Sequence, residues 1–457
     1  MKNKKILESL FKIFSKENIL WKKEDLFCYG YDSKEGNYLP DFVVFPNSAI
    51  QVSQVLKFCC QKRIYAVPRG AGTGTTGGSV PVKGGVVICL SKMNEILEVN
   101  NSDFYARVQP GVFTGELQRE VMKFNMFYPP DPASSDYCTI GGNIAECAGG
   151  PKAVKYGVTK DYVIGLEVVL PTGEIINTGV KTAKGVTGYD LTKLIIGSEG
   201  TLAIVTEATL KLLPAPEFVK TMISFFPSMN DAAKTVSKII QNGLIPRVLE
   251  YMDHLSIECI REDVNFELPE NAKALLIIES DGKKEFIDAE IEEIEKICKK
   301  NNSLTSIIAE DQEVKTRIWD VRKTLSSSLF KYGPDKINED IVVPRSKIPQ
   351  VVSKIEELKN QTNLSMVSFG HAGDGNIHFN IILDKTDEIL HEKAVSSVKE
   401  LFEYVIALGG TLSGEHGIGI TKKEYLSLEI DRNQRDLMRR IKNAFDPGGI
   451  LNPGKIL

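Results

Sequence analysis

The chain has 457 residues, which is room for two or more packed domains, so a single small module is excluded. Hydrophobic residues make up 42% and charged residues 25%, near the averages of soluble globular proteins, and this composition excludes a disordered or fibrous chain. The 56 basic and 60 acidic side chains nearly cancel, to a net charge of −4, which argues against nucleic acid as a partner.

The first residues alternate lysines with apolar residues at helical spacing. We therefore expect a separate helical segment, residues 1–37, that docks on the rest of the protein or on a partner. Contact with a membrane surface is the alternative. The sequence has no run of about 20 apolar residues and no apolar signal core, so a cytoplasmic location is predicted. The eight cysteines are scattered with no C-x-x-C pair, which predicts reduced thiols and argues against an iron–sulfur cluster.

The distribution of glycine indicates the domain organisation. Glycine clusters accompany short β-rich runs such as 85–90 and 164–170 up to Gly200. Pro214-Ala215-Pro216 then interrupts the chain, and we place the main domain boundary there. Beyond it, long helical stretches such as 285–300 alternate with strands such as 274–278, which predicts a separate α+β domain.

Residues 68–78 form a loop that reads Pro-Arg-Gly-Ala-Gly-Thr-Gly-Thr-Thr-Gly-Gly. Glycines at this density let the backbone take positive φ and approach a ligand, and the threonine hydroxyls and peptide N–H groups suit a pyrophosphate. The loop contains G-x-G-x-x-G, but Ser79-Val80-Pro81 follows, and this sequence cannot start the helix of a Rossmann site. The lysine of a Walker loop is absent as well. A glycine turn without a ligand is the alternative.

Further clusters follow at 129–135, 139–145, 148–150 and 197–202. Together with the 68–78 loop and Ile204, they resemble the FAD-binding domain of the vanillyl-alcohol oxidase and p-cresol methylhydroxylase superfamily. The resemblance implies a two-subdomain FAD-binding domain at residues 38–214, with the pyrophosphate on the backbone of 69–78. Many relatives link FAD to a histidine in this first loop. The comparable residue here is Thr73, so we expect noncovalent FAD.

The cofactor-binding residues that the resemblance implies lie in several segments. In the first loop they are Arg69, Gly70, Ala71, Gly72, Thr73, Gly74, Thr75, Gly77 and Gly78, and they continue with Asp131, Ser135, Thr139, Gly142, Asn143, Ala145, Gly149, Glu199, Ile204 and Asn452. Residues 139–145 should line the flavin and Ile204 the adenine. The last segment, residues 411–457, is expected to return to the FAD site.

Three of the five histidines fall in two glycine-rich motifs, Phe369–Asn380 and Ser413–Gly419. The glycines allow tight turns that can bring these side chains together. His371, His378 and Glu415 offer two imidazoles and one carboxylate, a donor set that suits zinc, manganese or ferrous iron and leaves positions for a substrate. The alternative is that the histidines only satisfy hydrogen bonds in a core.

Both motifs resemble the C-terminal domain of FAD-linked D-2-hydroxy-acid dehydrogenases, a family that includes D-lactate dehydrogenases and the flavin subunit of glycolate oxidase. The resemblance extends from about residue 40 to residue 455. It implies an α+β fold in which a substrate domain with an antiparallel sheet, residues 215–410, follows the FAD-binding domain. It also implies His371, His378 and Glu415 as ligands of one divalent metal, and His416 as the catalytic base.

Two substrate contacts are implied as well. Trp319-Asp320-Val321-Arg322 resembles the W-x-x-R element of the family, which makes Arg322 the candidate to clamp a carboxylate, with an ordinary surface arginine as the alternative. Asn380 matches a substrate-contact position of the D-2-hydroxyglutarate relatives. Some relatives also bring a lysine to the substrate. Here Lys336 is nearby, but Asn338 occupies the aligned position, which weakens the case for a dicarboxylate substrate.

We therefore expect FAD- and metal-dependent oxidation of a small D-2-hydroxy acid, D-lactate first, to its 2-oxo acid. A metal lowers the pKa of an alcohol, so that an imidazole such as His416, with an ordinary pKa of about 6.5, can serve as the base. Because the chain has no iron–sulfur motif, electrons should pass to a separate protein such as electron-transferring flavoprotein, with a quinone or an iron–sulfur subunit as the alternative acceptors. The alternatives are the flavin subunit of a glycolate-oxidising complex and a non-catalytic FAD electron-relay subunit.

Overall fold

The structure is a computed structural model that describes residues 2–33 and 36–457. It divides into two compact units. Unit 1 comprises residues 1–150, 158–215 and 415–457, and unit 2 comprises residues 151–157 and 216–414. The chain therefore leaves unit 1 briefly for residues 151–157, leaves it again between Ala215 and Pro216, and returns to it between Gly414 and Glu415.

The first sheet of unit 1 has the strand order β1-β2-β4-β3, in which β2, β4 and β3 are parallel. Helix α3 is capped by Ser48, whose hydroxyl accepts a hydrogen bond from the Gln51 amide, and the apolar residues of the helix pack on one face of this sheet. Residues 70–85, which connect β3 to β4, contain no helix, so this connection is not a Rossmann crossover. The elements are β1 (Ile19–Leu20), α2 (Lys23–Leu26), β2 (Phe42–Val44), α3 (Ala49–Lys62), β3 (Ala66–Arg69) and β4 (Val86–Cys89).

The second sheet of unit 1 is antiparallel, with the strand order β5-β6-β10-β8-β9. A short pair of strands, β7 and β11, stands apart from it. The strands are β5 (Ile96–Asn100), β6 (Tyr105–Val108), β7 (Met126–Phe127), β8 (Val163–Val169), β9 (Ile175–Gly179), β10 (Ile204–Lys211) and β11 (Leu213–Pro214). The helices are α4 (Thr114–Met122), α5 (Ile140–Glu146), α7 (Thr159–Tyr162) and α8 (Leu191–Ile195).

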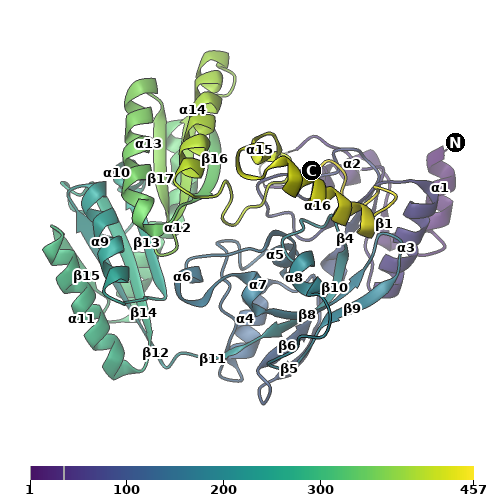
Figure 1. Cartoon of the computed structure of the whole chain (residues 1–457), viewed down its shortest axis with the longest axis horizontal. Coiled ribbons are helices and arrows are strands. Elements are labelled where there is room, and N and C mark those ends of the chain that lie inside the picture. Colours follow the sequence, from purple (N-terminus) through teal and green to yellow (C-terminus); the bar gives the residue numbers. More distant parts are fainter. Residues whose placement is uncertain (1, 34–35) are drawn as a thin grey trace. The chain divides into compact units, whose positions relative to one another are not determined.

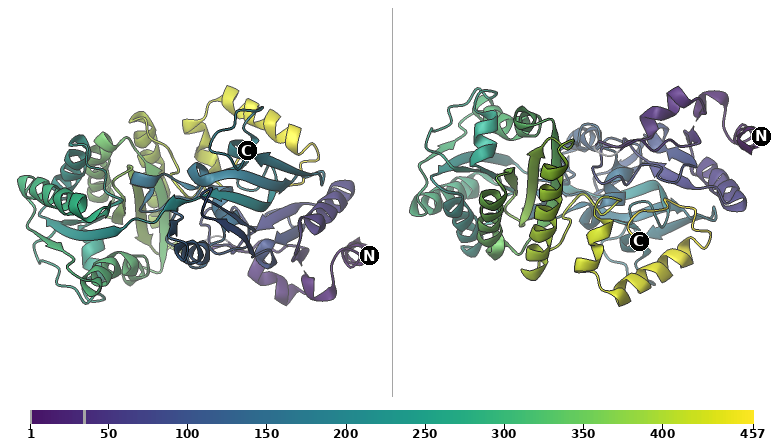
Figure 2. Two further views of the ribbon diagram at one scale, coloured as in Figure 1. Left: turned by 90° about the horizontal axis from the view of Figure 1, so that it is seen from below. Right: turned by 90° about the horizontal axis from the view of Figure 1, so that it is seen from above.

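Both ends of the chain pack on the first sheet of unit 1. The N-terminal helix α1 (Lys2–Leu10) places Leu10 in the core that α3 also lines, so the amphipathic segment docks on its own protein. After α15 (Leu426–Glu429) and α16 (Arg432–Phe445), the chain returns beside β3, where the Ala66 amide donates to Ile450 O at 2.9 Å. Figure 2 shows this C-terminal segment in yellow in two views.

Unit 2 is built on one antiparallel sheet with the strand order β15-β12-β14-β13-β17-β18-β16 (Figure 1). The predicted antiparallel sheet and α+β fold are thus confirmed. The strands are β12 (Phe218–Phe226), β13 (Val248–Asp253), β14 (Ala274–Gly282), β15 (Thr305–Ile308), β16 (Asp335–Val342), β17 (Ser365–His371) and β18 (Asn376–Leu383). The predicted helix at 285–300 is α11, and the strand predicted at 274–278 extends to Gly282.

Helices cover both faces of this sheet. α9 (Met229–Gln241), α11 (Lys284–Lys300), α13 (Ile348–Thr362) and α14 (Glu388–Ala407) form one layer. On the other face, α10 (His254–Ile260) and α12 (Gln312–Ser328) pack on a core that includes Met252, Ile277 and Phe369. The short helix α6 (Ala153–Tyr156) also belongs to unit 2. The face covered by α12 is the one that carries the site described next.

Candidate active site

His371 and His378 lie side by side on unit 2. His371 ends β17, and Phe369, two residues before it, is the register partner of His378 on β18, so both imidazoles leave the same face of the sheet. Their Nε2 atoms are 3.4 Å apart, and both residues are buried, with exposed fractions of 4% and 7%. The hairpin between them requires glycine at Gly375, because φ is +92° and a Cβ would lie 2.0 Å from Val343 O.

A buried carboxylate stands beside the other ring nitrogen of each histidine. Glu250 on β13 is the register partner of His371 and contacts its Nδ1. Asp340 on β16 is the register partner of His378, and its Oδ1 lies 3.8 Å from Nδ1. Both carboxylates are fully buried. A carboxylate on one nitrogen orients an imidazole and directs the other nitrogen, which is typical of metal-ligating histidines.

Glu250 also binds Arg322 of α12. The Arg322 Nε donates to Glu250 Oε2 at 2.8 Å, and the guanidinium carbon lies 4.7 Å from the centre of the Phe369 ring. Burial by itself raises the pKa of Glu250, but the charges of a protonated His371 and of Arg322, with their hydrogen bonds, lower that pKa to about 2. With a side chain only 14% exposed, Arg322 is not an ordinary surface arginine.

Asn380 lies two residues after His378 on the same sheet face and is fully buried. Its Oδ1 accepts a hydrogen bond from Asn338 Nδ2 at 2.9 Å, and its own Nδ2 has no acceptor among the described residues. Lys336 lies on the face of β16 that also carries Asn338, and its Nζ donates to Ser326 Oγ at 3.2 Å. The Asn380 amide is therefore a donor that a substrate oxygen would satisfy.

Asp340 ties the second histidine motif to the sheet of unit 2. Its Oδ2 accepts hydrogen bonds from the Gly414 amide at 2.9 Å and from Ser413 Oγ at 3.3 Å. Its Oδ1 accepts a hydrogen bond from the side chain of Asn376. Gly414 is the last residue of unit 2 along the chain, and Glu415 and His416 follow it directly.

Within unit 1, Glu415 and His416 adjoin two of the glycine segments. A Cβ on Gly149 would lie 2.6 Å from Glu415 Oε1, so the carboxylate packs against this glycine. The hydroxyl of Thr76, in the first glycine loop, donates to the carbonyl of His416 at 3.0 Å. The second motif and the first loop are therefore in contact inside one unit.

The first glycine loop wraps around the side chain of Arg69. The guanidinium Nη1 donates to Tyr31 O at 2.8 Å, and a Cβ on Gly72, where φ is +74°, would collide with this guanidinium. Gly77 also has a positive φ and donates its amide to Asp32 Oδ2 at 2.7 Å. Gly74, between these points, has open space around its Cα. The loop is thus fixed at both ends and accessible in its middle.

Glu199 joins the glycine segments to the C-terminal segment. Its carboxylate accepts hydrogen bonds from the amides of Ile418 and Gly419, both at 2.7 Å. Its carbonyl and that of Gly78 accept hydrogen bonds from Asn452 Nδ2, while Asn452 Oδ1 is buried and has no donor among the described residues. An unsatisfied buried acceptor beside a glycine loop suits a bound polar cofactor.

The remaining predicted cofactor residues have local roles. Thr139 caps α5 by accepting the Gly142 amide, and Asn143 Nδ2 donates to Thr114 Oγ1 at 2.7 Å. Two further positions are in close packing contacts: Gly70 lies against Thr139, and Asp131 lies against Gly150. Two others accept backbone hydrogen bonds: the carbonyl of Ser135 accepts the Gly115 amide, and that of Ala145 accepts the Glu199 amide. Ile204 lies in the core beneath α3.

Three carboxylates beside predicted site residues were not anticipated from the sequence: Glu250 and Asp340 in unit 2, and Glu146, beside Gly78, in unit 1. Glu250 is a charged residue in the interior of the buried strand Val248–Asp253, and this is the one signal that could have indicated it. Glu146 is half-buried in unit 1, and its Oε2 is shielded from solvent. Burial and then the charges of Glu199 and Asp32 raise its pKa well above the ordinary value. This carboxyl group is therefore protonated more readily than an exposed glutamate.

The arrangement of donors fits a divalent metal. A tetrahedral ion with nitrogen ligands at about 2.0–2.1 Å would hold two of them about 3.3 Å apart, and the Nε2 atoms of His371 and His378 are 3.4 Å apart.

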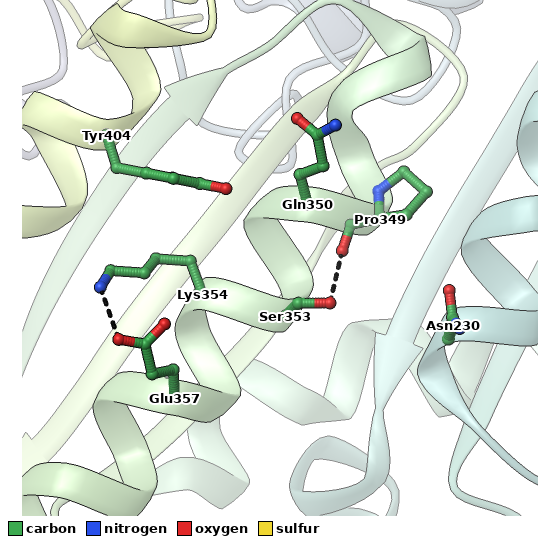
Figure 3. Close-up of a pocket in the computed structure, with 7 residues that line it drawn as sticks. All are labelled: Asn230, Pro349, Gln350, Ser353, Lys354, Glu357 and Tyr404. Carbon is green, nitrogen blue, oxygen red and sulfur yellow. Dashed lines mark hydrogen bonds and ion pairs between the residues drawn. The ribbon is translucent and has the colours of Figure 1, made fainter.

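A separate hollow on unit 2, lined by residues of α9, α13 and α14, contains none of the predicted residues (Figure 3). Its lysine, Lys354, is paired with Glu357 and Glu400.

In the described part of the chain, no helix combines the length and the apolar composition needed to cross a membrane. All eight cysteines are free thiols, and five of them are buried.

Comparisons with known proteins agree with this description. The family profile "FAD linked oxidases, C-terminal domain" matches residues 215–456, and "FAD binding domain" matches residues 40–179. The chain is 43% identical to glycolate oxidase subunit GlcD of Bacillus subtilis, over all of this chain and 97% of that protein. It is 36% identical to a D-lactate dehydrogenase of Anaerostipes hadrus, over 92% of this chain and 90% of that protein.

Solved structures give the same fold at low sequence identity. A structure of p-cresol methylhydroxylase with substrate bound superposes with a TM-score of 0.81, at 19% identity, over 99% of this chain and 96% of that one. 4-Ethylphenol oxidase from Gulosibacter chungangensis gives a TM-score of 0.79, at 18% identity, over 99% and 97%. The predicted resemblance is confirmed: this chain belongs to the family of FAD-linked oxidases and has a fold of the p-cresol methylhydroxylase type.

Proposed function

We propose that the protein oxidises a small D-2-hydroxy acid, D-lactate first, to its 2-oxo acid, with noncovalent FAD as the hydride acceptor and a divalent metal at the histidine pair. The observation that carries the proposal is the face of the unit 2 sheet on which His371 and His378 stand next to Arg322. The names of the relatives, glycolate oxidase subunit and D-lactate dehydrogenase, support this substrate class.

His371 and His378 would hold the metal through Nε2, and Glu415 would supply a carboxylate oxygen. Chain continuity supports the third ligand, since Glu415 follows Gly414, whose amide is bound by Asp340 beside His378. Two imidazoles and one carboxylate leave coordination positions for a substrate. Bound there, the metal would supply Lewis acidity that lowers the pKa of an alcohol.

Arg322 and Asn380 would bind the carboxylate of the substrate. The Glu250 carboxylate accepts the hydrogen bond from Arg322 Nε. The two terminal nitrogens of the guanidinium would then donate to the two oxygens of a substrate carboxylate. The Nδ2 of Asn380 offers a further donor from the same sheet face. With Lys336 bound to Ser326, the arrangement favours a substrate with one carboxylate.

His416 would act as the general base that takes the hydroxyl proton. The Thr76 hydroxyl donates to its carbonyl, and Glu199 accepts the amides of Ile418 and Gly419, so the backbone that follows the imidazole is fixed. Positioning of this kind is what proton transfer in a general-base step requires.

FAD would lie on unit 1, where its backbone contacts would come from the loop 69–78 and its further contacts from Asn452 and residues 139–145. Flavin supplies a hydride acceptor, which no amino-acid side chain provides. Thr73 stands where many relatives have a histidine linkage, which supports noncovalent binding. The reduced cofactor would pass its electrons to a separate acceptor protein, for which electron-transferring flavoprotein is our first candidate, and the site of action would be the cytoplasm.

The flavin subunit of a glycolate-oxidising complex is the second candidate, favoured by the relative from Bacillus subtilis. Steady-state turnover of FAD- and metal-replete protein with an artificial electron acceptor separates the two. We expect a higher kcat/KM for D-lactate than for glycolate. A higher value for glycolate would support the second candidate. No turnover with either acid or with other 2-hydroxy acids would contradict both and leave the electron-relay subunit.

A further inference from the structure

Glu250 contacts a candidate metal ligand and a candidate substrate ligand at the same time. One oxygen of its carboxylate contacts Nδ1 of His371. The other accepts a hydrogen bond from Nε of Arg322 at 2.8 Å. The carboxylate is fully buried, so these two contacts occupy it without competition from bulk water.

We propose that Glu250 is a positioning residue that sets the tautomer and orientation of His371 and, through the same carboxylate, the orientation of Arg322. The metal site and the carboxylate clamp would then form as one assembly rather than as two independent ones. The identities of the ion and of the substrate rest on the proposed function. The contacts of Glu250 do not.

The role follows from hydrogen-bond chemistry. An ionised carboxylate can only accept hydrogen bonds, so a neutral His371 beside it carries its single proton on Nδ1. The lone pair is then on Nε2, the nitrogen that faces Nε2 of His378 at 3.4 Å. Only this tautomer can ligate an ion between the two imidazoles.

A glutamine at this position separates the role from simple space filling. Glu250→Gln conserves the size of the side chain but replaces one acceptor oxygen with an NH₂ donor. Either His371 or Arg322 then faces a donor instead of an acceptor. If the NH₂ faces His371, the imidazole must move its proton to Nε2. If it faces Arg322, two donors meet and the guanidinium is displaced.

The neighbouring strand offers a matched control. Glu279 on β14 is also buried, with 3% exposed, and accepts hydrogen bonds from Thr221 Oγ1 and Trp319 Nε1. It pairs with Lys315 and Arg247 and forms no contact with the histidines in the described structure. Glu279→Gln therefore changes a buried carboxylate that also contacts α12, through Trp319, but removes no contact of Glu250 with His371 or Arg322.

The test measures Zn²⁺ affinity of the full-length, FAD-loaded protein by competition with a chelator, together with the KM for D-lactate at saturating metal. We expect Glu250→Gln to weaken Zn²⁺ binding about 10- to 100-fold, the usual effect of losing the partner of a ligating histidine, and to raise KM, with the FAD content unchanged. Glu279→Gln should match the wild type. Wild-type Zn²⁺ affinity in Glu250→Gln, or an equal loss in Glu279→Gln, would overturn the proposal.

A second measurement needs no substrate and no change at Glu250. The chain has five histidines, so ¹⁵N-histidine NMR spectra of the metal-free wild type are sparse, and His371→Asn assigns the signal of interest. At about pH 8, where ordinary imidazoles are neutral, His371 should carry its proton on Nδ1. A proton on Nε2 with none on Nδ1 would overturn the proposal even if Glu250→Gln failed to fold. A protein with the Nδ1 proton but no activity on 2-hydroxy acids would contradict the proposed function alone.

Discussion

The Nε2 atoms of His371 and His378 face each other at 3.4 Å, with their rings nearly perpendicular, at 89°. The pairing of β17 with β18 produces this geometry, and the carboxylates of Glu250 and Asp340 come from the two strands that flank the pair. Buried histidines that only filled a core would not need a carboxylate on each side. The arrangement therefore favours ligation over the core interpretation.

The first prediction concerns Arg322. Arg322→Met should raise the KM for D-lactate about 10- to 100-fold, because a charge-assisted, bidentate contact to the carboxylate is lost. Arg317→Met is the matched control, since Arg317 lies on the same helix and pairs with the exposed Glu313. Steady-state kinetics of both variants decide the matter. An equal change in KM in both variants would show that Arg322 does not bind the substrate.

His416→Ala should leave FAD bound and slow flavin reduction by at least about 100-fold, the usual scale for losing a general base. The backbone contacts of His416 with Thr76 do not depend on the imidazole, so the loop should persist. Stopped-flow absorbance measures the rate, and His391→Ala on α14 serves as the control. A wild-type rate in His416→Ala would remove His416 from the mechanism.

Gly375→Ala tests the hairpin that joins the two histidines. A Cβ would lie 2.0 Å from Val343 O in a backbone with φ of +92°, so we expect the free energy of unfolding to fall by ~2–5 kcal/mol. Zn²⁺ binding should weaken with it. Gly409→Ala has a similar φ of +78° but open space, and should cost only about 1 kcal/mol. Denaturant unfolding measures both, and equal losses would contradict a steric role for Gly375.

Glu146 should make stability depend on pH. Burial, with the charges of Glu199 and Asp32, raises its pKa in the fold, so its contribution to stability is complete below the unfolded pKa of about 4.5. That contribution is lost as the pH rises through the folded pKa. Glu146→Gln cannot ionise, so its free energy of unfolding should exceed that of the wild type at pH 8, by on the order of 1–3 kcal/mol, and the difference should vanish near pH 4.

Urea unfolding of the FAD-loaded protein at several pH values measures this difference. Glu116→Gln, at an exposed position of α4, is the control and should follow the wild type. A wild type that is as stable as Glu146→Gln at pH 8 would show that Glu146 ionises in the fold without cost.

Local sequence patterns predicted the elements and the motif residues well. Strand β14 and helix α11 were expected from their periodicity, and the antiparallel sheet of the second unit was expected from the family resemblance. The glycines around His371 and His378 correctly indicated a tight turn, because a positive φ and a close backbone approach are properties of the turn itself.

Contacts between distant segments could not be predicted in the same way. Glu250 precedes His371 by 121 residues, and Glu199 precedes Gly419 by 220 residues. Which strand becomes the neighbour of β17, and in which register, depends on the packing of the whole sheet rather than on local residues. An acid in a buried strand therefore indicates a partner but does not identify it.

Anaerobic reduction of the bound flavin by D-lactate tests the central claim most directly. Metal-replete protein should lose its flavin absorbance on mixing with D-lactate, and deuterium on carbon 2 should slow this step. Chelated protein should keep its FAD and stay oxidised. No bleaching of the metal-replete protein by D-lactate or by other 2-hydroxy acids, or undiminished bleaching after verified metal removal, would contradict the account.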